Sequence, residues 1–312
     1  MPPQEQPDLL LVPPAAVPPM PETRTGASTV TRFDLRLGDC LNGMREMADQ
    51  SVDLVVTSPP YNLGIGYSNY DDSRPDDEYL HWCVDWAREI RRLLKPDGSF
   101  FLNVGAAPSN PLMPHRLLLA LTPEVFCLQN TFHWIKSITV EPRGGDPVSA
   151  GHFKPINSNR YVNDCHEFVF HFSKSGSVTL NRRRVGVEYV HKSNIARWGH
   201  TGGQDKRCRG NNWFIPYETI QRRDKERPHP ATFPVKLAEM CIGIVAPEPA
   251  EMVMMDPFLG IGHAAVAAQN AGVGTFIGFE IDEGYFREAE DRLGSGGRNP
   301  ETESVSNSEQ AD

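Results

Sequence analysis

The segment from residue 252 to residue 280 constrains the fold more than any other part of this sequence. An apolar run at 252–255 predicts a buried strand that leads into a glycine-rich turn at 256–262. An alanine-rich helix is predicted from about residue 264 to 271, with Gly272 as its C-cap. A second strand at 276–279 then ends in Glu280. This order is typical of the α/β crevices that bind nucleotides, where glycines admit a ligand close to the backbone and the acid accepts hydrogen bonds from ribose hydroxyls.

A second informative segment is Thr57-Ser58-Pro59-Pro60-Tyr61, which follows a run that predicts a buried strand at 51–56. Two consecutive prolines donate no backbone hydrogen bonds and restrict the preceding residue to extended geometry. The result is a stiff turn rich in carbonyl acceptors, which suits the binding of an exocyclic amino group, with Tyr61 as a flat ring beside it. The alternative is a solvent-side turn that only closes the strand.

Together these segments resemble the amino-methylating DNA methyltransferases, which methylate N4 of cytosine or N6 of adenine. Their Ser/Asp-Pro-Pro-Tyr/Phe catalytic motif is matched by residues 58–61, and their Phe-x-Gly-x-Gly methyl-donor motif by Phe258, Gly260 and Gly262. Further blocks similar to the family lie at 38–41, 165–174, 212–216 and 229–234. The resemblance covers roughly residues 33 to 293, and the catalytic motif precedes the donor motif, as in the permuted beta group.

The resemblance implies a doubly wound, mostly parallel Rossmann-like α/β sheet that binds S-adenosylmethionine. It implies that the catalytic residues are Ser58, Pro59, Pro60 and Tyr61. It also implies that the methyl donor is bound by Asp39, Thr57, His229, Pro230, Phe233, Pro234, Asp256, Pro257, Phe258, Gly260, Gly262 and Glu280. No metal site is expected, because none of the six cysteines forms a Cys-x-x-Cys pair.

The chemistry expected at Ser58 follows from the weak nucleophilicity of an amino group on an aromatic ring. The enzyme must localise the nitrogen lone pair by accepting hydrogen bonds from its N–H groups, and the Ser58 hydroxyl and the Pro59 carbonyl are the predicted acceptors. Tyr61 is expected to stack on the target base, which has to be flipped out of the duplex to react. Positioning supplies most of the rate.

Composition divides the 312 residues into five segments. A Pro-rich arm at 1–30 and a polar tail at 294–312 are expected to be disordered. Between them we predict a catalytic half at 31–173, a target-recognition region at 174–228 and a donor-binding half at 229–293. No run approaches 18 apolar residues, which excludes a membrane span on sequence grounds, and cysteines without a disulfide pattern favour the cytoplasm.

Charge is distributed unevenly along the chain. The formal net charge is −9, yet residues 174–228 hold thirteen Lys/Arg against five Asp/Glu, interspersed with aromatic residues and glycines. Basic side chains bind phosphates and guanine edges, so this segment is the predicted binding site for double-stranded DNA. A solvated basic loop is the alternative. The predicted DNA-binding residues are Arg182, Arg183, Arg184, Lys206, Arg207, Arg209, Arg222 and Arg223.

Two connections, 62–74 and 141–160, are predicted loops of the kind that close over an active site. Asp76 is the predicted cap of a helix at about 77–94, which the turn at 95–98 would end before a strand at 99–104.

Several functional alternatives remain open at this point. Ser-Pro-Pro is typical of the N4-cytosine enzymes and Asp-Pro-Pro of the N6-adenine enzymes, so Ser58 favours cytosine N4. A C5-cytosine enzyme is disfavoured because the chain has no Pro-Cys nucleophile motif. A catalytically silent DNA-binding module and an enzyme acting on structured RNA are the other readings. A companion restriction endonuclease would be a functional rather than a physical partner, and the chain is expected to act as a monomer or homodimer.

Overall fold

The computed structural model describes residues 30–62, 64, 72–141, 145–151, 158–197, 202–216 and 232–294. The predicted arm at 1–30, except its last residue, and the predicted tail beyond residue 294 lie outside the described residues. In the described ranges no helix is long and apolar enough to cross a membrane.

Most of the described strands form one sheet of eight strands in the order β1-β10-β9-β2-β3-β7-β4-β8. Neighbouring strands are parallel from β1 through β3, and β7 runs antiparallel between β3 and β4. The strands are β1 (Arg32–Leu37), β2 (Val52–Thr57), β3 (Leu94–Val104), β4 (Cys127–Ile135), β7 (His166–Ser173), β8 (Asn212–Phe214), β9 (Val253–Asp256) and β10 (Thr275–Glu280). This is the mostly parallel α/β sheet that the sequence predicts.

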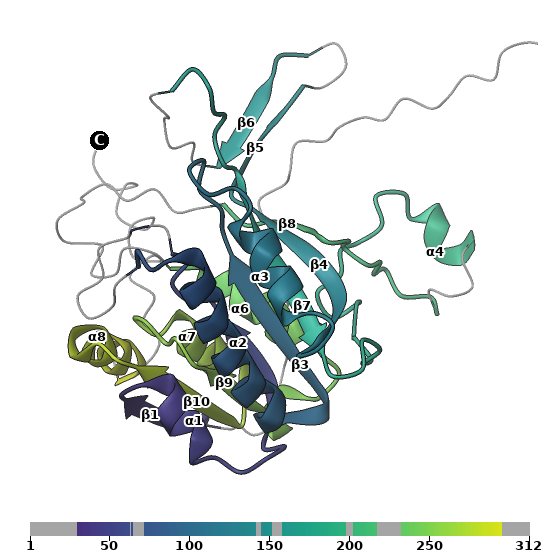
Figure 1. Ribbon diagram of the computed structural model, residues 1–312. Coiled ribbons are helices and arrows are strands. Elements are labelled where there is room, and N and C mark those ends of the chain that lie inside the picture. The colour runs from purple at the N-terminus through teal and green to yellow at the C-terminus, as the bar shows by residue number, and fades with distance from the viewer. Residues whose placement is uncertain are drawn as a thin grey trace, which may run out of the picture.

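Helices cover both faces of the sheet, so its strands are apolar on both sides (Figure 1). One layer contains α1 (Cys40–Arg45), α2 (Asp76–Leu93) and α3 (Met113–Leu121). The other contains α6 (Val235–Ile244), α7 (His263–Ala271) and α8 (Glu283–Gly294). Successive side chains of β2 point to opposite faces, so Leu54 packs in the α6–α7 layer and Val55 in the α1–α2 layer. Because both faces are covered, the strand sequence is a continuous apolar run.

The order of the strands brings distant parts of the chain to one edge. β9 pairs with β2, from the opposite end of the sequence, with Met254 opposite Leu54. The carboxyl ends of the parallel strands therefore meet where β1, β10, β9, β2 and β3 end. β7 is antiparallel, with Phe168 opposite Val104, so its first residues lie at this same edge. In open α/β sheets, ligands bind at such an edge, where the strand order reverses.

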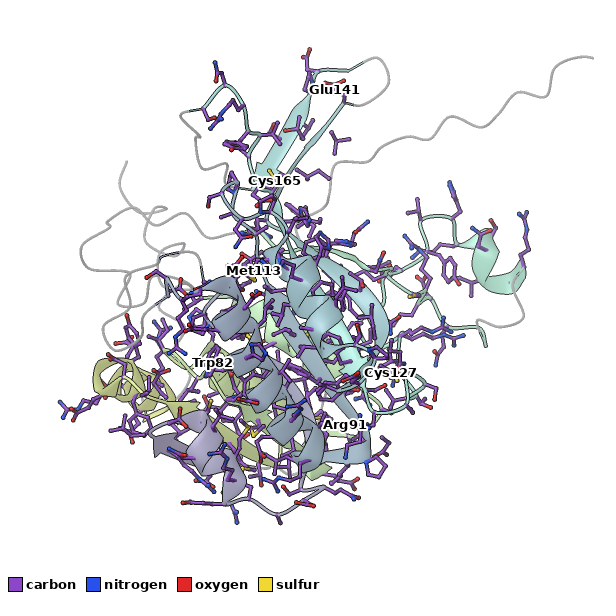
Figure 2. The ribbon with its side chains drawn as sticks, in the orientation of Figure 1. Trp82, Arg91, Met113, Cys127, Glu141 and Cys165 are labelled. Atoms are coloured by element: carbon purple, nitrogen blue, oxygen red, sulfur yellow. The ribbon has the colours of Figure 1, made fainter. Side chains whose placement is uncertain are left out.

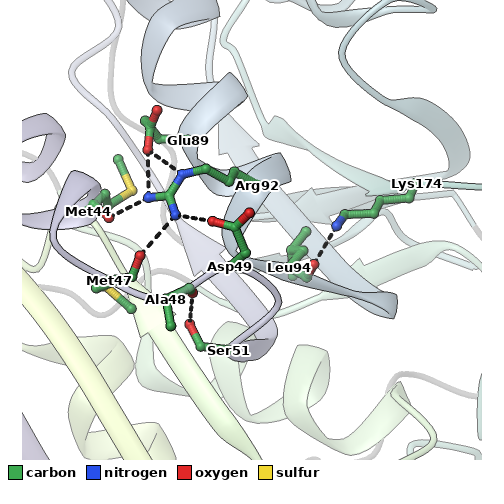
Figure 3. Close-up of polar contacts among 9 residues, drawn as sticks. All are labelled: Met44, Met47, Ala48, Asp49, Ser51, Glu89, Arg92, Leu94 and Lys174. Atoms are coloured by element: carbon green, nitrogen blue, oxygen red, sulfur yellow. Dashed lines mark hydrogen bonds and ion pairs between the residues drawn. The ribbon is translucent and has the colours of Figure 1, made fainter.

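The ends of α2 differ from the prediction. The N-cap is Pro75, and Asp76 is the first helical residue, where its carboxylate pairs with Arg116. β3 begins at Leu94, directly after the helix, so residues 95–98 belong to a strand whose pairing with β2 is irregular at this point. Near the other end of α2, the Arg92 guanidinium binds the Met44 and Met47 carbonyls and the Asp49 and Glu89 carboxylates (Figure 3). This contact ties α1 to α2.

The predicted loop at 141–160 is only partly a loop. A hairpin of β5 (Ser137–Val140) and β6 (Val148–Gly151) projects from the sheet, with Glu141 near its tip and Cys165 near its base (Figure 2). Its strands are only four residues long and half exposed, so the sequence has no apolar periodicity there that would predict them. Residues 142–144 and 152–157 lie outside the described residues.

The described residues of the predicted target-recognition region, 174–197 and 202–216, are joined to the body of the protein. The chain leaves the sheet after β7, carries the short helix α4 (Ser193–Arg197) and makes isolated bridges at Leu180–Val245 and Val187–Arg207. It then returns as β8, an edge strand of the main sheet. Trp213 of β8 is buried against Phe132, with ring centroids 4.3 Å apart, so this aromatic residue belongs to the core.

Candidate active site

A cleft opens at the carboxyl edge of the sheet, between the loops that follow β1, β2, β9 and β10. Eight of the sequence-predicted residues line it, namely Asp39, Ser58, Pro60, Phe233, Pro257, Phe258, Gly260 and Glu280. The catalytic and donor motifs, about 200 residues apart in the sequence, therefore face the same space. Pro234 is the N-cap of α6, and His229 and Pro230 lie outside the described residues.

The glycine turn after β9 requires glycine for two different reasons. Gly260 has a φ of +53° and lines the cleft, so the backbone itself forms the wall there. Gly262 has a φ of +87°, and a Cβ on it would lie 3.0 Å from the Cβ of Ala289. Its absent side chain therefore makes room for α8, and the role predicted for Gly262 in donor binding stays a prediction.

Glu280 is positioned by the backbone on both sides of it. One carboxylate oxygen accepts from the Gly260 amide at 2.7 Å and the other from the Asp282 amide at 2.9 Å. Burial raises the pKa of Glu280, and the two amides partly oppose that shift. Each carboxylate oxygen can accept a second hydrogen bond. The residue can therefore hold the glycine turn and still accept a hydroxyl from the cleft.

Asp39 lies beside Glu280 at the end of β1, where Gly38 donates to the Glu280 carbonyl at 2.7 Å. The Asp39 carboxylate accepts from the Asn42 amide at 2.9 Å and caps α1. Gly38, Asp39 and Cys40 all line the cleft. The local sequence Gly-Asp therefore turns the chain and presents an acid to the cleft, as predicted.

Thr57 and Asp256 lie beneath the cleft and do not line it. Both are fully buried, and the Thr57 hydroxyl donates to the Asp256 carboxylate at 2.5 Å. Burial raises the pKa of Asp256 to about 7, while the hydrogen bonds from Thr57 and from the Phe258 amide work against that shift. Their hydrogen bonds join β2 to β9 and support the turn above, and the donor contact predicted for them stays a prediction.

An aromatic wall closes one side of the cleft. Trp82 of α2 packs on Phe258 with ring centroids 5.5 Å apart, and the Arg74 guanidinium lies 5.6 Å from the Trp82 ring. Figure 2 shows Trp82 on α2. Arg74 and Trp82 line the cleft but were not predicted as site residues. Trp82 is one of several apolar residues at helical spacing, a pattern that indicates only a buried helix face.

The catalytic turn contains a dense set of hydrogen bonds. The Ser58 hydroxyl lies 2.5 Å from the Tyr61 hydroxyl, which donates to the Glu167 carboxylate at 3.1 Å. The Asn103 amide donates to both the Tyr61 hydroxyl and Glu167 at 2.6 Å, and Lys136 pairs with Glu167 at 2.6 Å. Of these side chains only Ser58 lines the cleft. The Tyr61 side chain is 9% exposed. The sequence predicted a stacking role for its ring, whereas the structure shows that its hydroxyl also joins this set of hydrogen bonds.

The two proline carbonyls have different surroundings. The Pro60 carbonyl accepts from the Tyr79 hydroxyl at 2.8 Å, which fixes the turn on α2. Among the described residues, no hydrogen bond is recorded to the Pro59 carbonyl. The predicted choice of Pro59 rather than Pro60 as an acceptor for a ligand is compatible with this geometry.

The sequence profile of the DNA methylase family (N6_N4_Mtase) matches residues 52–291. The chain belongs to this family.

Relatives support the same assignment over most of the chain. The type II methyltransferase M.ScaI of Streptomyces caespitosus is 30% identical over 267 residues, which cover 82% of this chain and 79% of that protein. The type II methyltransferase M.PvuII of Proteus hauseri is 27% identical and covers 83% of each chain. The structure of the cytosine-N4-specific PvuII DNA methyltransferase superposes with a TM-score of 0.61 at 21% identity, covering 85% of this chain and 87% of the other. This likeness confirms the Rossmann-like methyltransferase fold.

The basic residues of this methylase fall into two groups. The Arg184 guanidinium pairs with Glu248 at 2.5 Å and donates to the Pro247 carbonyl, and Arg209 donates to the Val185 carbonyl at 3.0 Å. Both anchor the basic segment to the body of the protein. In the other group, Arg182 and Arg207 are exposed, whereas Arg183 and Lys206 are half-buried, and Arg183 donates to the Gln204 side chain. Arg222 and Arg223 lie outside the described residues.

Proposed function

We propose that this DNA methylase transfers a methyl group from S-adenosylmethionine to the exocyclic N4 amino group of cytosine, at specific sites in duplex DNA. The observation that carries the proposal is the position of the Ser58 hydroxyl, which faces the same cleft as the glycine turn and Glu280. A hydrogen-bond acceptor for an amino group thus adjoins a site with the features of a nucleoside pocket.

S-adenosylmethionine fits the donor side of the cleft by the chemistry of the residues there. Glu280 can accept ribose hydroxyls, and Asp39 lies where the adenine is expected. Gly260 leaves the backbone open to close approach, with Phe258 and Phe233 as apolar walls. When bound, this cofactor supplies an electrophilic methyl group on a sulfonium. A solved structure with the same fold, titled a putative DNA modification methylase from Thermus thermophilus, is described as complexed with S-adenosyl-L-methionine and covers 85% of this chain with a TM-score of 0.53 at 20% identity.

On the acceptor side, Ser58 and the Pro59 carbonyl accept the two N–H groups of the target amino group. These hydrogen bonds localise the nitrogen lone pair, which is otherwise delocalised into the ring. No covalent intermediate with the protein is required. Positioning of the nitrogen toward the donor side supplies most of the rate.

The reacting base has to leave the duplex, because the turn after β2 lies at the base of the cleft and stacked bases are inaccessible. Tyr61 stays the predicted contact for the flipped ring, through the part of its side chain that borders the turn. The exposed cations Arg182 and Arg207 are the proposed phosphate contacts.

Cytosine N4 is preferred to adenine N6 for two reasons. The chain has Ser58 where N6 enzymes typically have aspartate, and a relative that is 27% identical carries the same name as a structure described as cytosine-N4-specific. Adenine N6 is the second candidate, because the matching family model covers both activities by name.

The test is nucleoside analysis of DNA from a methylation-deficient host that expresses the protein, followed by mapping of the modified sites. We expect N4-methylcytosine at one short sequence, and much less of it in a host that expresses Ser58→Ala. N6-methyladenine instead would replace the first candidate by the second. Unmodified DNA, from a folded protein at normal abundance, would overturn both.

A further inference from the structure

A series of hydrogen-bonded side chains, here called the file, leads from the cleft into the protein through Ser58, Tyr61 and Glu167. Ser58 lies at the cleft, its hydroxyl is 2.5 Å from that of Tyr61, and Tyr61 donates to Glu167 at 3.1 Å. The other oxygen of Glu167 pairs with Lys136 at 2.6 Å. The file thus begins at an acceptor for the substrate and ends at a charged carboxylate behind it.

The register of the sheet explains how these residues meet. β7 is antiparallel to β3, with Asn103 opposite Val169, so Glu167 and Asn103 project from the same face. Glu167 also lies opposite Trp134 in β4, and Lys136 follows two residues later on that side. Asn103 is 3% exposed and donates to both Tyr61 and Glu167. Three strands therefore converge on the turn that follows β2.

The direction of each hydrogen bond in the file is determined by its last member. An ionised carboxylate only accepts, so Tyr61 gives its single proton to Glu167. The Asn103 amide can only donate through its nitrogen, so it requires acceptors at the same two positions. Tyr61 must then accept from Ser58, which uses the one proton of Ser58. The Ser58 oxygen also accepts a long contact from the Asn103 amide at 3.5 Å, and it keeps one lone pair for an amino group in the cleft.

Amino methylation produces a proton that has to be removed. As the nitrogen forms its bond to the methyl carbon, the carbon–sulfur bond of the donor breaks and its electron pair stays on sulfur. The positive charge passes to the methylated base, and neutrality returns only when one N–H proton leaves. An acceptor in contact with that N–H group is therefore needed.

We propose that Ser58, Tyr61 and Glu167 form a proton relay that removes this proton. The inference rests on the proposed function and deepens it. The N–H proton passes to the Ser58 oxygen as the Ser58 proton passes to Tyr61 and the Tyr61 proton to Glu167. Both hydroxyls end neutral, with their hydrogen bonds reversed, and Glu167 ends as a neutral acid beside Lys136. Asn103 and Lys136 are positioning residues, because they hold Glu167 without lying on the path.

Other titratable groups nearby are placed differently. Lys136 and Tyr61 are the titratable partners of Glu167 recorded in the described part of the chain. His166 is adjacent to Glu167 on β7 and so points to the opposite face, where its ring lies 5.8 Å from that of His133. Burial and the neighbouring His166 lower the pKa of His133. A change of rate with pH in the wild type alone would not separate these groups, so the test compares variants.

The test measures methyl transfer in a single turnover, with enzyme in excess over sites in plasmid DNA from a methylation-deficient host and radiolabelled S-adenosylmethionine. Glu167→Gln keeps the shape and can still accept from Tyr61, but it cannot take up a proton. We expect its rate to fall about 10²-fold, the usual contribution of a positioned base. Tyr61→Phe should fall by a similar factor. The double variant should be no slower than either, because both changes interrupt one path.

The pH dependence distinguishes a relay from a structural effect. The wild-type rate should decline toward acid pH, and Glu167→Gln should lack that decline. Glu167→Asp, which retains a carboxylate, should recover part of the rate and the decline with it. Glu239→Gln is the matched control, because Glu239 also pairs with a lysine, Lys236, at 3.1 Å, but on α6. Wild-type kinetics in Glu167→Gln, or multiplicative losses in the double variant, would overturn the relay.

A readout without turnover tests the same inference independently. Infrared difference spectra of the free protein, wild type against Glu167→Gln, should show an ionised carboxylate at neutral pH. A protonated carboxyl band there would overturn the relay, because the direction of the file would be lost. If the wild type methylates no DNA at all, the proposed function fails instead. The spectra would still decide whether Glu167 can act as an acceptor.

Discussion

The two halves of the cleft are built from different parts of the chain. The donor half presents the glycine turn, the Phe258 ring and the Glu280 carboxylate to the cleft. The carboxylates of Glu280 and of the buried Asp256 accept hydrogen bonds from amides and a hydroxyl of the protein itself. The acceptor half presents the Ser58 side chain, supported by a file of side chains from β3, β4 and β7. We therefore expect binding of the donor to depend on the glycine turn and its carboxylate, and chemistry on the target to depend on the polar atoms around Ser58. Substitutions should separate the two.

Ser58→Ala should have the largest effect and should act on the acceptor half alone. It removes an acceptor that matters most as the amino nitrogen rehybridises, so the single-turnover rate should fall about 10²- to 10³-fold. Affinities for S-adenosylmethionine and DNA should change less than about threefold, since other contacts dominate both. Rapid-quench kinetics and calorimetry give the two quantities.

The matched control is Ser51→Ala, at the other end of the same strand, where the hydroxyl binds only the Ala48 carbonyl (Figure 3). It should leave the rate unchanged. A reduction of donor affinity in Ser58→Ala as large as its reduction of rate would contradict the separation of the two halves.

Glu280→Gln should show the converse pattern. The amide keeps one acceptor for the Gly260 amide but loses the negative charge, and charge-assisted hydrogen bonds exceed neutral ones by about 1 kcal/mol. Donor affinity should fall roughly tenfold for each 1.4 kcal/mol of binding free energy removed, whereas the rate at saturating donor should stay near that of the wild type. Glu283→Gln, three residues away and 63% exposed, is the control. An unchanged donor affinity would remove Glu280 from the site.

Asp256→Asn tests the buried support beneath the donor half through its pH dependence. The pKa of Asp256 is raised to about 7 by burial, so the folded protein holds this proton more tightly than the unfolded chain. The contribution of protonated Asp256 to stability is therefore fully present below about pH 4, declines between about pH 4 and pH 7, and is absent above about pH 7.

Asparagine removes that decline, so the variant should gain on the wild type by roughly 1–3 kcal/mol between pH 5 and pH 8. Urea unfolding at both pH values measures the difference. A gap between the two proteins that stays constant with pH would show that Asp256 is ionised in the folded state throughout.

The donor half could be predicted from the sequence more completely than the acceptor half, for a physical reason. The glycine turn, the helix that Gly272 ends and the acid at Glu280 are consecutive, and each is determined by local backbone requirements. Asn103 and Glu167 become neighbours only through the antiparallel pairing of β3 with β7. Nothing in the sequence around either residue specifies that register. Residues that act through partners in distant strands are therefore the ones that sequence reasoning misses.

The same limit affected the basic residues and the buried supports. Arg184 looks like its neighbours in the sequence, but its partner Glu248 is 64 residues away and makes it an anchor. Thr57 and Asp256 were predicted from their positions in the two motifs, and only the structure shows that their side chains bind each other below the cleft. Proximity in sequence to a motif predicted their importance but not their role.

The basic segment should affect neither half of the cleft and should contribute only to DNA affinity. Arg182→Ala with Arg207→Ala removes two exposed cations, so the slope of log affinity against log salt should become shallower by about one unit for each phosphate that is no longer bound. Donor affinity should stay as in the wild type.

Arg88→Ala, 63% exposed on α2, is the control for a general loss of charge. Arg184→Ala should instead lower the stability of the segment, because it releases the contact with Glu248. An unaltered salt dependence in the Arg182 and Arg207 variant would place the duplex on another face, and the loops around the cleft, rather than this segment, would then carry the DNA contacts.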